Sequence, residues 1–511
     1  MPVDKVAGMA RIAVIGAGMG AMAAAARLAV AGHRVAVYER TETYGGAVRR
    51  FERDGFAFDT GPGLLHLPAV YRDLFIKTGK ESLEDTVELV QVDPASRHVF
   101  ADGTEVSLPN ASRAGVVAAL DEALGGGAGQ RWGDFLVRAR EAWDRTRRPL
   151  LEEPLWPNWQ VLAEREPYPA VPHKRLLRTR RASTLAEIGD WELRDERLSA
   201  LLRSHALAYG LDPRTAPASA AVLPYMEHAF GAWYVRGGMR ELARAVYERC
   251  LKRKVEFAFG AEVTRIVEKS GRAAGVELAD GTVAEADHVV ADVDPGRLRA
   301  LTEHPLDADG DVRSGPASPP TGRVSVLLAL RGGREAAAAH RTVVHAPDSE
   351  RELDLLVAPG GDLAVCPTVT VLRPDDPALR PDSAHESVVV SAAVSTDAGW
   401  EDEATTLRYT DFLLEAAGHA IPGLRERLLW HEVRTPGHTE GETGALSGAV
   451  PAPVLAAGGG RFLHPANTTR LPGLYRVGGW SHPGGGLPHA GMSGALVAGL
   501  IVEGPDFRGS Q

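Results

Sequence analysis

The stretch that decides the fold is "RIAVIGAGMGAMAAAARLAVAGHRVAVYER", residues 11–40. Residues 11–15 and 35–38 have the composition of short buried strands, and the alanine-rich run 19–31 between them has the composition of a helix. A strand, a tight turn, a helix and a second strand form a βαβ unit. The stretch therefore predicts an α/β fold that contains a Rossmann-type domain.

The turn of this unit carries a glycine pattern that is typical of dinucleotide binding. Gly16, Gly18 and Ala21 occupy the three small positions of G-x-G-x-x-G/A, with Gly20 between the last two. Small residues there allow the tight turn, the approach of a pyrophosphate and close packing of the helix. Glu39, at the end of the second strand, can accept hydrogen bonds from a ribose diol, which favours an adenosine ribose without a 2′-phosphate.

Further glycines suggest that one ligand is held at several points. Gly45 and Gly46 follow the acidic residue, and "DTGPG" at 59–63 adds a second turn where backbone can approach a ligand closely. Near the C-terminus, "VGGWSHPGGGLPHAGMSG" at 477–494 combines a glycine-rich surface with the start of a helix, whose N–H groups can stabilise negative charge. The residues that these segments contribute to the predicted cofactor site are Arg40, Gly45, Gly46, Gly61, Pro62, Gly63, Leu64, Gly478, Gly479, Leu487, Pro488 and Met492.

Three blocks of the chain together resemble a known family. They are the N-terminal unit with Gly45, Gly46 and "DGFAFDTGPGLL", the middle stretches "AFGAWYVRGGMRELARAV" and "GAEVTRIVEKSGRAAGVELADGTVAEADHVVADVDP", and the C-terminal "LPGLYRVGGWSHPGGGLPHAGMSGALVAGLI". They are similar to bacterial carotenoid (phytoene-type) desaturases, within the FAD-dependent amine-oxidase superfamily. Gly478, Gly479 and Trp480 stand where many amine oxidases have G-E-A, which favours the carotenoid branch.

The resemblance implies a two-domain, amine-oxidase/GDI-like architecture. A discontinuous FAD-binding domain is expected from residues 1–70, 221–300 and 455–511, and a substrate-binding domain with a mixed sheet and helices from 71–220 and 301–454. The backbone of Val263 is expected to lie against the adenine. Residues 71–220 are expected to be mostly helical, but the proline- and aromatic-rich stretch 152–175 within them cannot be a long helix, and it is expected either to cap the domain core or to line an apolar entrance.

The implied activity is transfer of a hydride from a substrate C–H to flavin N5, which creates a C=C or C=N bond. The substrate is expected to be an apolar isoprenoid or polyene, or a secondary-metabolite intermediate. An amine or amino-acid oxidase and a redox-neutral carotenoid isomerase remain alternatives, and the complete set of glycines argues against a non-enzymatic lipid escort. Because no second glycine pattern for a nicotinamide cofactor occurs, oxygen or a quinone is the expected electron acceptor.

Catalytic residues are harder to predict, since the flavin itself accepts the hydride. The candidates are His482, Trp480, Glu227 and His228, followed by His489, His66 and Trp233. Each has an equally ordinary structural role as an alternative. Trp480 and His482 interrupt a segment that is otherwise poor in side chains, so they are expected to face the substrate.

Composition excludes several other classes of function. A net charge of -10 gives no reason to bind nucleic acid, and the basic runs 174–181 and 249–254 are expected to be solvated helix faces or, less readily, a membrane-surface contact. Cys250 and Cys366 form no CxxC motif or disulfide framework, so no metal site is predicted and a reducing cytoplasm is expected. No stretch is apolar enough to span a bilayer, so any membrane contact is expected to be peripheral.

Overall fold

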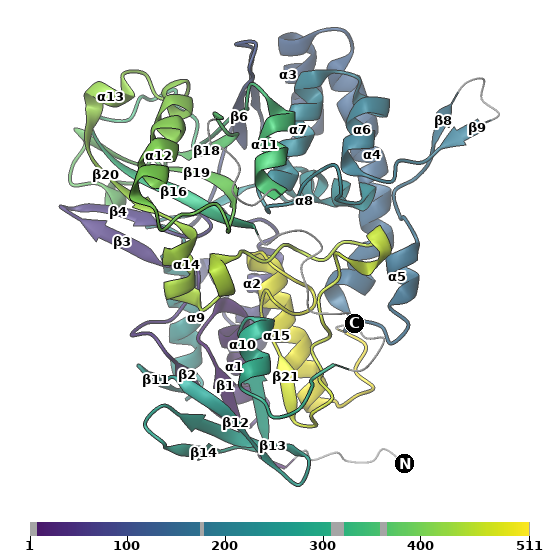
Figure 1. Cartoon of the computed structure of the whole chain (residues 1–511), viewed down its shortest axis with the longest axis vertical. Coiled ribbons are helices and arrows are strands. Elements are labelled where there is room, and N and C mark those ends of the chain that lie inside the picture. The colour runs from purple at the N-terminus through teal and green to yellow at the C-terminus, as the bar shows by residue number, and fades with distance from the viewer. Residues whose placement is uncertain (1–7, 174–177, 308–320, 358–364, 510–511) are drawn as a thin grey trace.

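The computed structural model describes residues 8–173, 178–307, 321–357 and 365–509 (Figure 1). A five-stranded sheet, parallel throughout, lies at the end of the molecule that carries the N-terminus, and a larger mixed sheet and a group of helices lie at the other end (Figure 1). The parallel sheet has the order β11 (Glu256–Phe259), β2 (Arg34–Glu39), β1 (Arg11–Ile15), β15 (His288–Ala291) and β21 (Leu474–Arg476). Three distant parts of the chain therefore build one sheet around β1.

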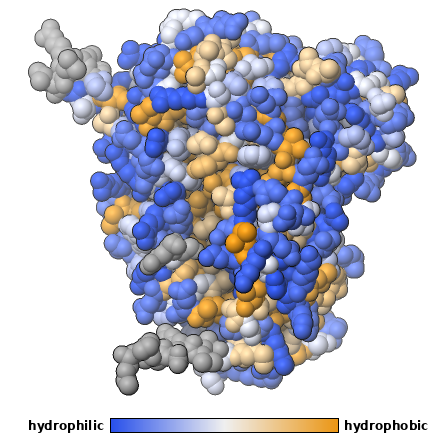
Figure 2. Space-filling model, turned by 180° about the vertical axis from the view of Figure 1, so that it is seen from behind, coloured by the Kyte–Doolittle hydropathy of each residue, from blue (hydrophilic) through white to orange (hydrophobic). Residues whose placement is uncertain are grey.

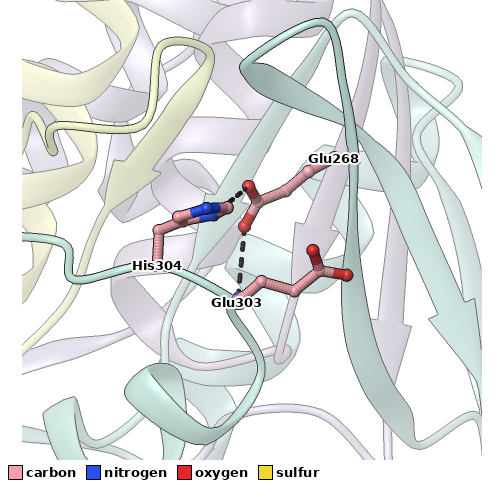
Figure 3. Close-up of side chains that lie close together, drawn as sticks. All are labelled: Glu268, Glu303 and His304. Atoms are coloured by element: carbon pink, nitrogen blue, oxygen red, sulfur yellow. Dashed lines mark hydrogen bonds and ion pairs between the residues drawn. The ribbon is translucent and has the colours of Figure 1, made fainter.

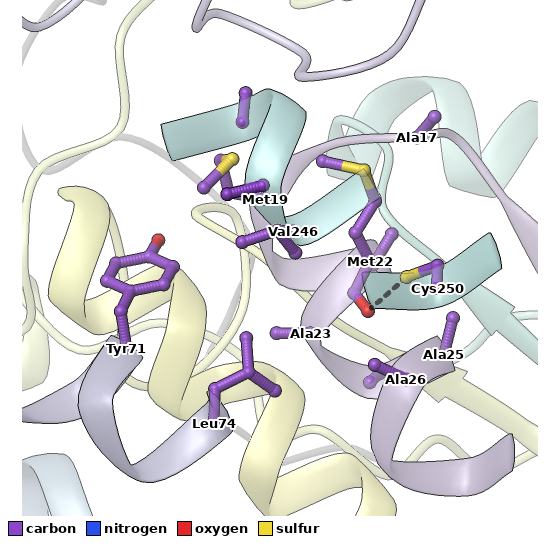
Figure 4. Packing of buried hydrophobic residues seen from close by; sticks show 14 of the residues in the cluster. Ala17, Met19, Met22, Ala23, Ala25, Ala26, Tyr71, Leu74, Val246 and Cys250 are labelled. Atoms are coloured by element: carbon purple, nitrogen blue, oxygen red, sulfur yellow. Dashed lines mark hydrogen bonds between the residues drawn. The ribbon is translucent and has the colours of Figure 1, made fainter. Parts of the chain in front are cut away.

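The βαβ unit forms as its sequence predicts. The first strand has the predicted bounds, and the helix α1 (Met19–Val30) ends one residue earlier than expected. Four helices pack against this sheet and one another: α1, α2 (Ala69–Gly79), α9 (Arg240–Lys252) and α15 (Leu487–Val502). Figure 4 shows Met22 and the small side chains of α1 packed against Val246 and Cys250 of α9 and Leu74 of α2.

The alanines and glycines of α1 let a second helix approach very closely. A Cβ added to Gly494 of α15 would lie 2.6 Å from the carbonyl oxygen of Gly20. Ala23, Ala24 and Ala26 are completely buried. Contact at this distance between two helices requires small residues on both of them, and it fixes where α15 begins relative to α1.

A three-stranded antiparallel sheet flanks the parallel one. It contains β12 (Val263–Lys269), β13 (Arg272–Leu278) and β14 (Val283–Glu285), and its apolar face packs on the outer side of β1 and β15. The turn "ADGT" at 279–282 joins β13 to β14.

The second large sheet has seven strands and is mixed. Its order is β20 (Leu428–Arg434), β16 (Thr321–Arg331), β19 (His385–Ser395), β18 (Val369–Leu372), β17 (Arg341–Val344), β6 (Ser96–Val99) and β7 (Glu105–Leu108), and of its six pairings only that between β17 and β6 is parallel. The expected mixed sheet is thereby confirmed.

Apolar residues cover both faces of the long central strand β16. Val326 and Leu328 pack toward the helix α12 (Glu403–Gly418), whereas Leu327 and Ala329 pack against the hairpin of β3 (Arg50–Arg53) and β4 (Phe56–Asp59). Alternation along a strand sends successive side chains to opposite faces, so a continuous apolar run is buried on both sides.

A group of helices extends the mixed sheet. It contains α3 (Arg113–Leu124), α4 (Ala128–Arg147), α5 (Gln160–Glu164), α6 (Leu185–Ile188), α7 (Glu196–Leu207) and α8 (Val222–Phe230). The stretch 152–175, which was predicted not to be a long helix, contains in its described residues the end of the π-helical turn η2 (Arg148–Glu152), the short helix α5 and the strand β8 (Val171–His173). Tyr168 is completely buried and donates a hydrogen bond to Glu192 (2.7 Å), as expected of a segment that caps a core.

Packing places two domain boundaries differently from the sequence-based expectation. The division at residue 70 falls inside α2, whose Tyr71 and Phe75 belong to the core around the parallel sheet. The division at 221 falls before α8, which packs on α4 in the helical group. We therefore propose that the first boundary follows Val87 and that the middle segment of the cofactor domain begins near Gly231.

Neither basic run is wholly the solvated helix face that was expected, although Lys252 at the end of α9 is exposed. In the first, residues 174–177 lie outside the described residues, and Arg178–Arg180 form the strand β9, which pairs with β8 (Val171–His173). In the second, the side chain of Arg249 is only 1% exposed, because it lies over the ring of Phe75 and pairs with Glu81 (2.5 Å). The face of α9 that carries Arg249 packs on α2 rather than meeting solvent.

Candidate active site

The first glycine loop joins β1 to α1 and has no space for side chains. Gly16 has a φ of +90°, which favours glycine, and its N–H donates to the carbonyl of Tyr38 (2.8 Å). A Cβ on Gly18 would lie 2.4 Å from Oδ2 of Asp292, and one on Gly20 would lie 2.7 Å from the Cα of Gly478. Glycine therefore lets other groups approach the first turn of α1 closely, and there the N–H of Ala21 donates to the carboxyl group of Asp292 (3.3 Å).

A second glycine turn packs directly on the first. The N–H of Gly45 donates to the carbonyl of Ala17 (2.7 Å), and a Cβ on Gly46 would lie 3.1 Å from the Cα of Gly18. The turn at 59–64 is also packed too closely for a side chain, since a Cβ on Gly61 would lie 2.0 Å from the carbonyl oxygen of Ala47. Pro62, Gly63 and Leu64 continue this turn toward the mixed sheet.

The C-terminal glycines complete the same surface. Gly478 lies between Gly20 and Asp292, and Gly479 packs on Pro451. The helix α15 then begins at Leu487 with Pro488 in its first turn and Met492 one turn later. The structure thus brings the two N-terminal glycine turns and the C-terminal segment, which is hundreds of residues further along the chain, to the neighbouring N-termini of α1 and α15 (Figure 1).

Glu39 lies at the end of β2, beside the first glycine loop. It is 7% exposed, and its carboxylate accepts hydrogen bonds from the N–H groups of Ala17 (2.8 Å) and Thr41 (2.9 Å). The N–H of Ala261 donates to the Glu39 carbonyl, which brings the start of β12 and Val263 to the same edge of the site. The arrangement suits a carboxylate that receives a ribose diol.

Arg40 points away from this surface. Its guanidinium donates to the carbonyl oxygens of Glu440 (3.1 Å) and Gly441 (2.5 Å), at the C-terminal end of α14 (Pro436–Thr443). The structure therefore assigns Arg40 to docking this helix, rather than to the direct cofactor contact that was expected.

Asp292 was missed by the sequence analysis, although it lies at the centre of the site. It follows β15, contacts Gly16, Gly18 and Gly478, and accepts a hydrogen bond from the N–H of Ala21 (3.3 Å). Burial, and in smaller part the charge of Glu39, raises the pKa of Asp292 to about 7. A carboxyl residue at the C-terminal end of a predicted parallel strand is a signal that could have identified it.

Taken together, these residues fit a dinucleotide. Three glycine segments leave a surface that any Cβ would obstruct, two helix N-termini meet there, and an acidic side chain lies at the edge of the first loop. Such a surface can hold a pyrophosphate, a ribose and a planar ring in close contact with the backbone.

His482 does not face the substrate, contrary to expectation. The side chain is completely buried, and its Nε2 makes a hydrogen bond with the carbonyl oxygen of Glu153 (2.9 Å). Burial lowers the pKa of His482 to about 4, so the ring is a neutral structural link between the C-terminal loop and the segment after η2. Trp480 is half-buried in the same loop, and His489 is buried with its Nδ1 facing Gly486.

The neighbouring candidates Glu227 and His228 point in different directions. Successive residues of a helix lie about 100° apart, so only one of the two can face a given site. Glu227 forms an ion pair with Arg341 and lies beside His66, whereas His228 lies near Arg113.

Trp233 also points away from the glycine surface. Its indole N–H donates to the carbonyl of Phe230 (2.8 Å), and its ring lies under the guanidinium of Arg72 (5.5 Å). These contacts give Trp233 a packing role.

Within the described residues, a single group of three side chains is close enough together to share a metal ion, and Figure 3 shows it: Glu268, Glu303 and His304. The carboxylate of Glu268 already accepts from the Glu303 N–H (3.2 Å) and contacts Nδ1 of His304 (3.0 Å). The group lies at the surface beside β12 and fixes the loop after α10 (Pro295–Ala300), away from the glycine surface.

The chain matches the family model "Flavin containing amine oxidoreductase" over residues 22–339. It is 30% identical to the hydroxyneurosporene desaturase of Cereibacter sphaeroides, over 96% of this chain and 97% of that protein. It is 29% identical to the 4,4'-diapolycopene oxygenase of a Methylomonas species (96% and 98%) and 29% identical to the phytoene dehydrogenase of Streptomyces griseus (98% and 96%).

Solved structures agree on the fold. An oxidoreductase from Methanosarcina mazei superimposes with a TM-score of 0.65 at 18% identity, covering 95% of this chain and 99% of that one. A putrescine oxidase bound to putrescine superimposes with a TM-score of 0.63 at 13% identity (97% and 99%). The chain therefore belongs to the flavin containing amine oxidoreductase family, and it is a flavin-dependent oxidoreductase that is similar over nearly its whole length to bacterial carotenoid desaturases.

Proposed function

We propose that the protein is an FAD-dependent desaturase that removes two hydrogens from an apolar isoprenoid polyene and creates a C=C bond. The observation that carries the proposal is the similarity, over nearly the full length of both chains, to several proteins named as carotenoid desaturases. The uninterrupted glycine surface supports it, since each close approach is made by a glycine.

FAD is the flavin that this surface suits best. The first glycine loop and the N-terminus of α1 match a diphosphate, and Glu39 lies where an adenosine ribose would follow. FMN has neither of these groups, so it would leave this half of the site unused. Val263 remains our candidate for the adenine contact.

Bound FAD would supply the two-electron acceptor, which takes a hydride from the substrate. The chain itself would position the cofactor and the substrate and exclude water from the site. The N–H groups that open α15, beside Leu487 and Pro488, would stabilise negative charge on the ring. The substrate then loses a proton from the adjacent carbon, and the electron pair of that C–H bond forms the new double bond.

Proton removal need not involve a charged base. His482 is sequestered, and burial lowers the pKa of His489 to about 4, so that His489 is neutral in the ordinary pH range. A polyene that loses a hydride develops cationic character, which makes the neighbouring C–H acidic.

The reduced cofactor must pass its electrons onward, and we propose oxygen or a quinone as the acceptor. Polyenes dissolve in membranes, so delivery from a membrane surface is the natural route. None of the described helices has the length and hydropathy of a membrane span. On the face shown in Figure 2, hydrophobic residues gather along a hollow between polar margins, which supports apolar access there.

The test is anaerobic mixing of the FAD-loaded protein with acyclic polyenes in micelles, followed by mass analysis of the product. Bleaching of the flavin together with a loss of two hydrogens is expected. An unchanged product mass would mean isomerisation, and bleaching by amines but not by polyenes would mean an amine oxidase; either result overturns the proposal.

Asp292 predicts how cofactor affinity depends on pH. Its pKa is raised to about 7 in the folded protein, so the carboxyl is neutral below that pH and charged above it. A charged carboxylate beside Gly16 and Gly18 would repel the diphosphate, so FAD affinity should fall on the order of tenfold between about pH 6 and pH 8. The folded protein binds the proton of Asp292 more tightly than the unfolded chain does. The free energy of unfolding therefore also falls as the pH rises from the unfolded pKa of this carboxyl to about 7.

Asp292→Asn should bind FAD with an affinity that hardly changes over this pH range. The measurement is a fluorescence titration of apoprotein with FAD at each pH. An equal pH dependence in both proteins would show that another group is responsible.

A further inference from the structure

A buried charged cluster lies in the part of the molecule expected to hold an apolar substrate. It consists of Glu227 on α8, Arg341 at the start of β17, His66 after the glycine turn 59–64, and His205 on α7. We call these four residues the Glu227 cluster. Four different elements supply them, so only the fold brings them together.

The cluster is organised around one carboxylate. Arg341 binds Glu227 with both terminal nitrogens, Nη1 at 3.0 Å from Oε2 and Nη2 at a shorter contact with Oε1. Burial alone would raise the pKa of Glu227, but the charge and hydrogen bonds of Arg341 hold it well below its ordinary value. Glu227 is thus ionised and neutralised by Arg341, which makes it a poor proton acceptor and argues against the catalytic role first considered for it.

The two histidines present lone pairs toward the same oxygen. Nδ1 of His66 contacts the carbonyl oxygen of Gly231 (3.3 Å), and Nδ1 of His205 contacts that of Leu201 (3.0 Å). Because a carbonyl oxygen only accepts, each Nδ1 must carry a proton, and burial lowers both pKa values so that the rings are neutral. Each Nε2 is therefore an acceptor.

These acceptors converge without bonding one another. Nε2 of His66 lies 3.9 Å from Oε2 of Glu227, and Nε2 of His205 lies 4.0 Å from the same atom. Two acceptors at this distance cannot form a hydrogen bond, and buried acceptors require a donor. In addition, the Nε of Arg341 is buried without a hydrogen-bond partner.

The cluster lines accessible space, unlike the histidines behind it. Glu227, Arg341 and His205 each have 14% of their side-chain surface accessible. His98 and His345, which contact each other at 3.0 Å deeper in the same region, are 1% and 6% exposed. The Glu227 cluster is therefore open to a ligand.

The cluster is also near the cofactor surface. His66 lies three residues beyond Gly63 of the glycine turn. Tyr209 lies within electrostatic range of Glu227, and its ring would be 3.8 Å from a Cβ on Gly486, just before α15. One aromatic side chain thus separates the cluster from the C-terminal glycine loop.

We propose that the Glu227 cluster binds a hydroxyl group of the substrate, which donates its hydrogen to the acceptors and accepts from Arg341. This inference rests on the proposed function and specifies it: the substrate is a hydroxylated polyene rather than a hydrocarbon. A neutral donor suits the site because Arg341 already balances the charge of Glu227. An ammonium group would add an unbalanced charge to a buried site.

The first test compares three matched substrates: an acyclic polyene with a terminal hydroxyl, its methyl ether and the parent hydrocarbon, all in the same micelles. The alcohol should have a kcat/KM at least about tenfold higher than the other two, since an unpaired buried polar group strongly disfavours the analogue without the hydroxyl. The ether is decisive because it accepts hydrogen bonds but cannot donate them. Equal kcat/KM values for alcohol and ether, or preference for an amine, would overturn the inference.

Variants of the cluster histidines distinguish a loss of substrate specificity from general damage to the fold. His205→Phe and His66→Phe should each lower kcat/KM for the alcohol much more than kcat/KM for the hydrocarbon, so that the preference for the alcohol falls toward parity. His419→Phe, the same exchange at an exposed histidine after α12, should retain the preference. A proportional loss with all three substrates in the cluster variants would contradict a hydroxyl-binding role.

A binding measurement keeps the inference separate from the proposed function. The three compounds are titrated against the oxidised FAD-loaded protein, and binding is followed by the change in the flavin spectrum. Tighter binding of the alcohol, lost in His205→Phe, supports the inference even if no compound is desaturated, a result that would overturn the proposed function alone. Equal affinities would overturn the inference.

Discussion

Gly20→Val is expected to give a folded but nearly flavin-free protein. A Cβ at position 20 would lie 2.7 Å from the Cα of Gly478 and 3.1 Å from the carbonyl oxygen of Ala490, so it meets backbone on two sides. The start of α15 would have to move away from α1, and the surface between them would open. Overpacking of this kind typically costs about 1–3 kcal/mol, which would reduce flavin occupancy to less than about a tenth.

The measurement is the ratio of flavin absorbance to protein absorbance after purification, together with the circular dichroism spectrum. Gly418→Val is the matched control, since Gly418 is also helical but has no neighbouring atom within 4 Å of an added Cβ. A yellow Gly20→Val protein with wild-type flavin content would show that the close helix approach does not hold the cofactor.

Local sequence was sufficient to predict the strand β1 and the helix α1. The strand 11–15 and the helix that follows depend on short-range composition and on a glycine turn, and both agree with the structure to within one residue. The resemblance to a known family made it possible to predict the mixed sheet and a discontinuous cofactor domain. What neither supplied was the contact between Gly20 and Gly478, because it depends on how the loop after β21 docks on the first turn of α1.

Side-chain direction was the main reason why catalytic residues could not be predicted. His482 stands in a glycine-rich loop and appeared free to face the substrate, yet its ring turns toward Glu153. Glu227 and His228 are adjacent in sequence but face different sides of α8. Arg341 had no local pattern to mark it, since it meets Glu227 only through the pairing of β17 in the mixed sheet.

Glu386→Ala is expected to cause the largest loss of stability. Glu386 of β19 is completely buried, and its carboxylate accepts two hydrogen bonds from Arg373 (2.7 and 3.0 Å) and one from Arg427 (2.7 Å). The Arg373 side chain is itself only 2% exposed, so removing the carboxylate leaves a buried cation whose remaining ion-pair partner is the half-exposed Glu335. Removing one partner of a buried pair typically costs about 3–5 kcal/mol.

The effect should be seen as a large fall in the midpoint of thermal unfolding, whereas the flavin content of protein prepared in the cold stays normal, because the pair lies in the mixed sheet and not beside the glycine loops. Glu285→Ala is the control: its carboxylate pairs with Lys269 and Arg11 at the surface, where solvent screens the charges, and the midpoint should not change. If both variants unfold at the wild-type temperature, the buried network does not stabilise the sheet. If Glu386→Ala loses flavin in the cold as well, the mixed sheet and the cofactor domain are coupled more tightly than their separate cores suggest.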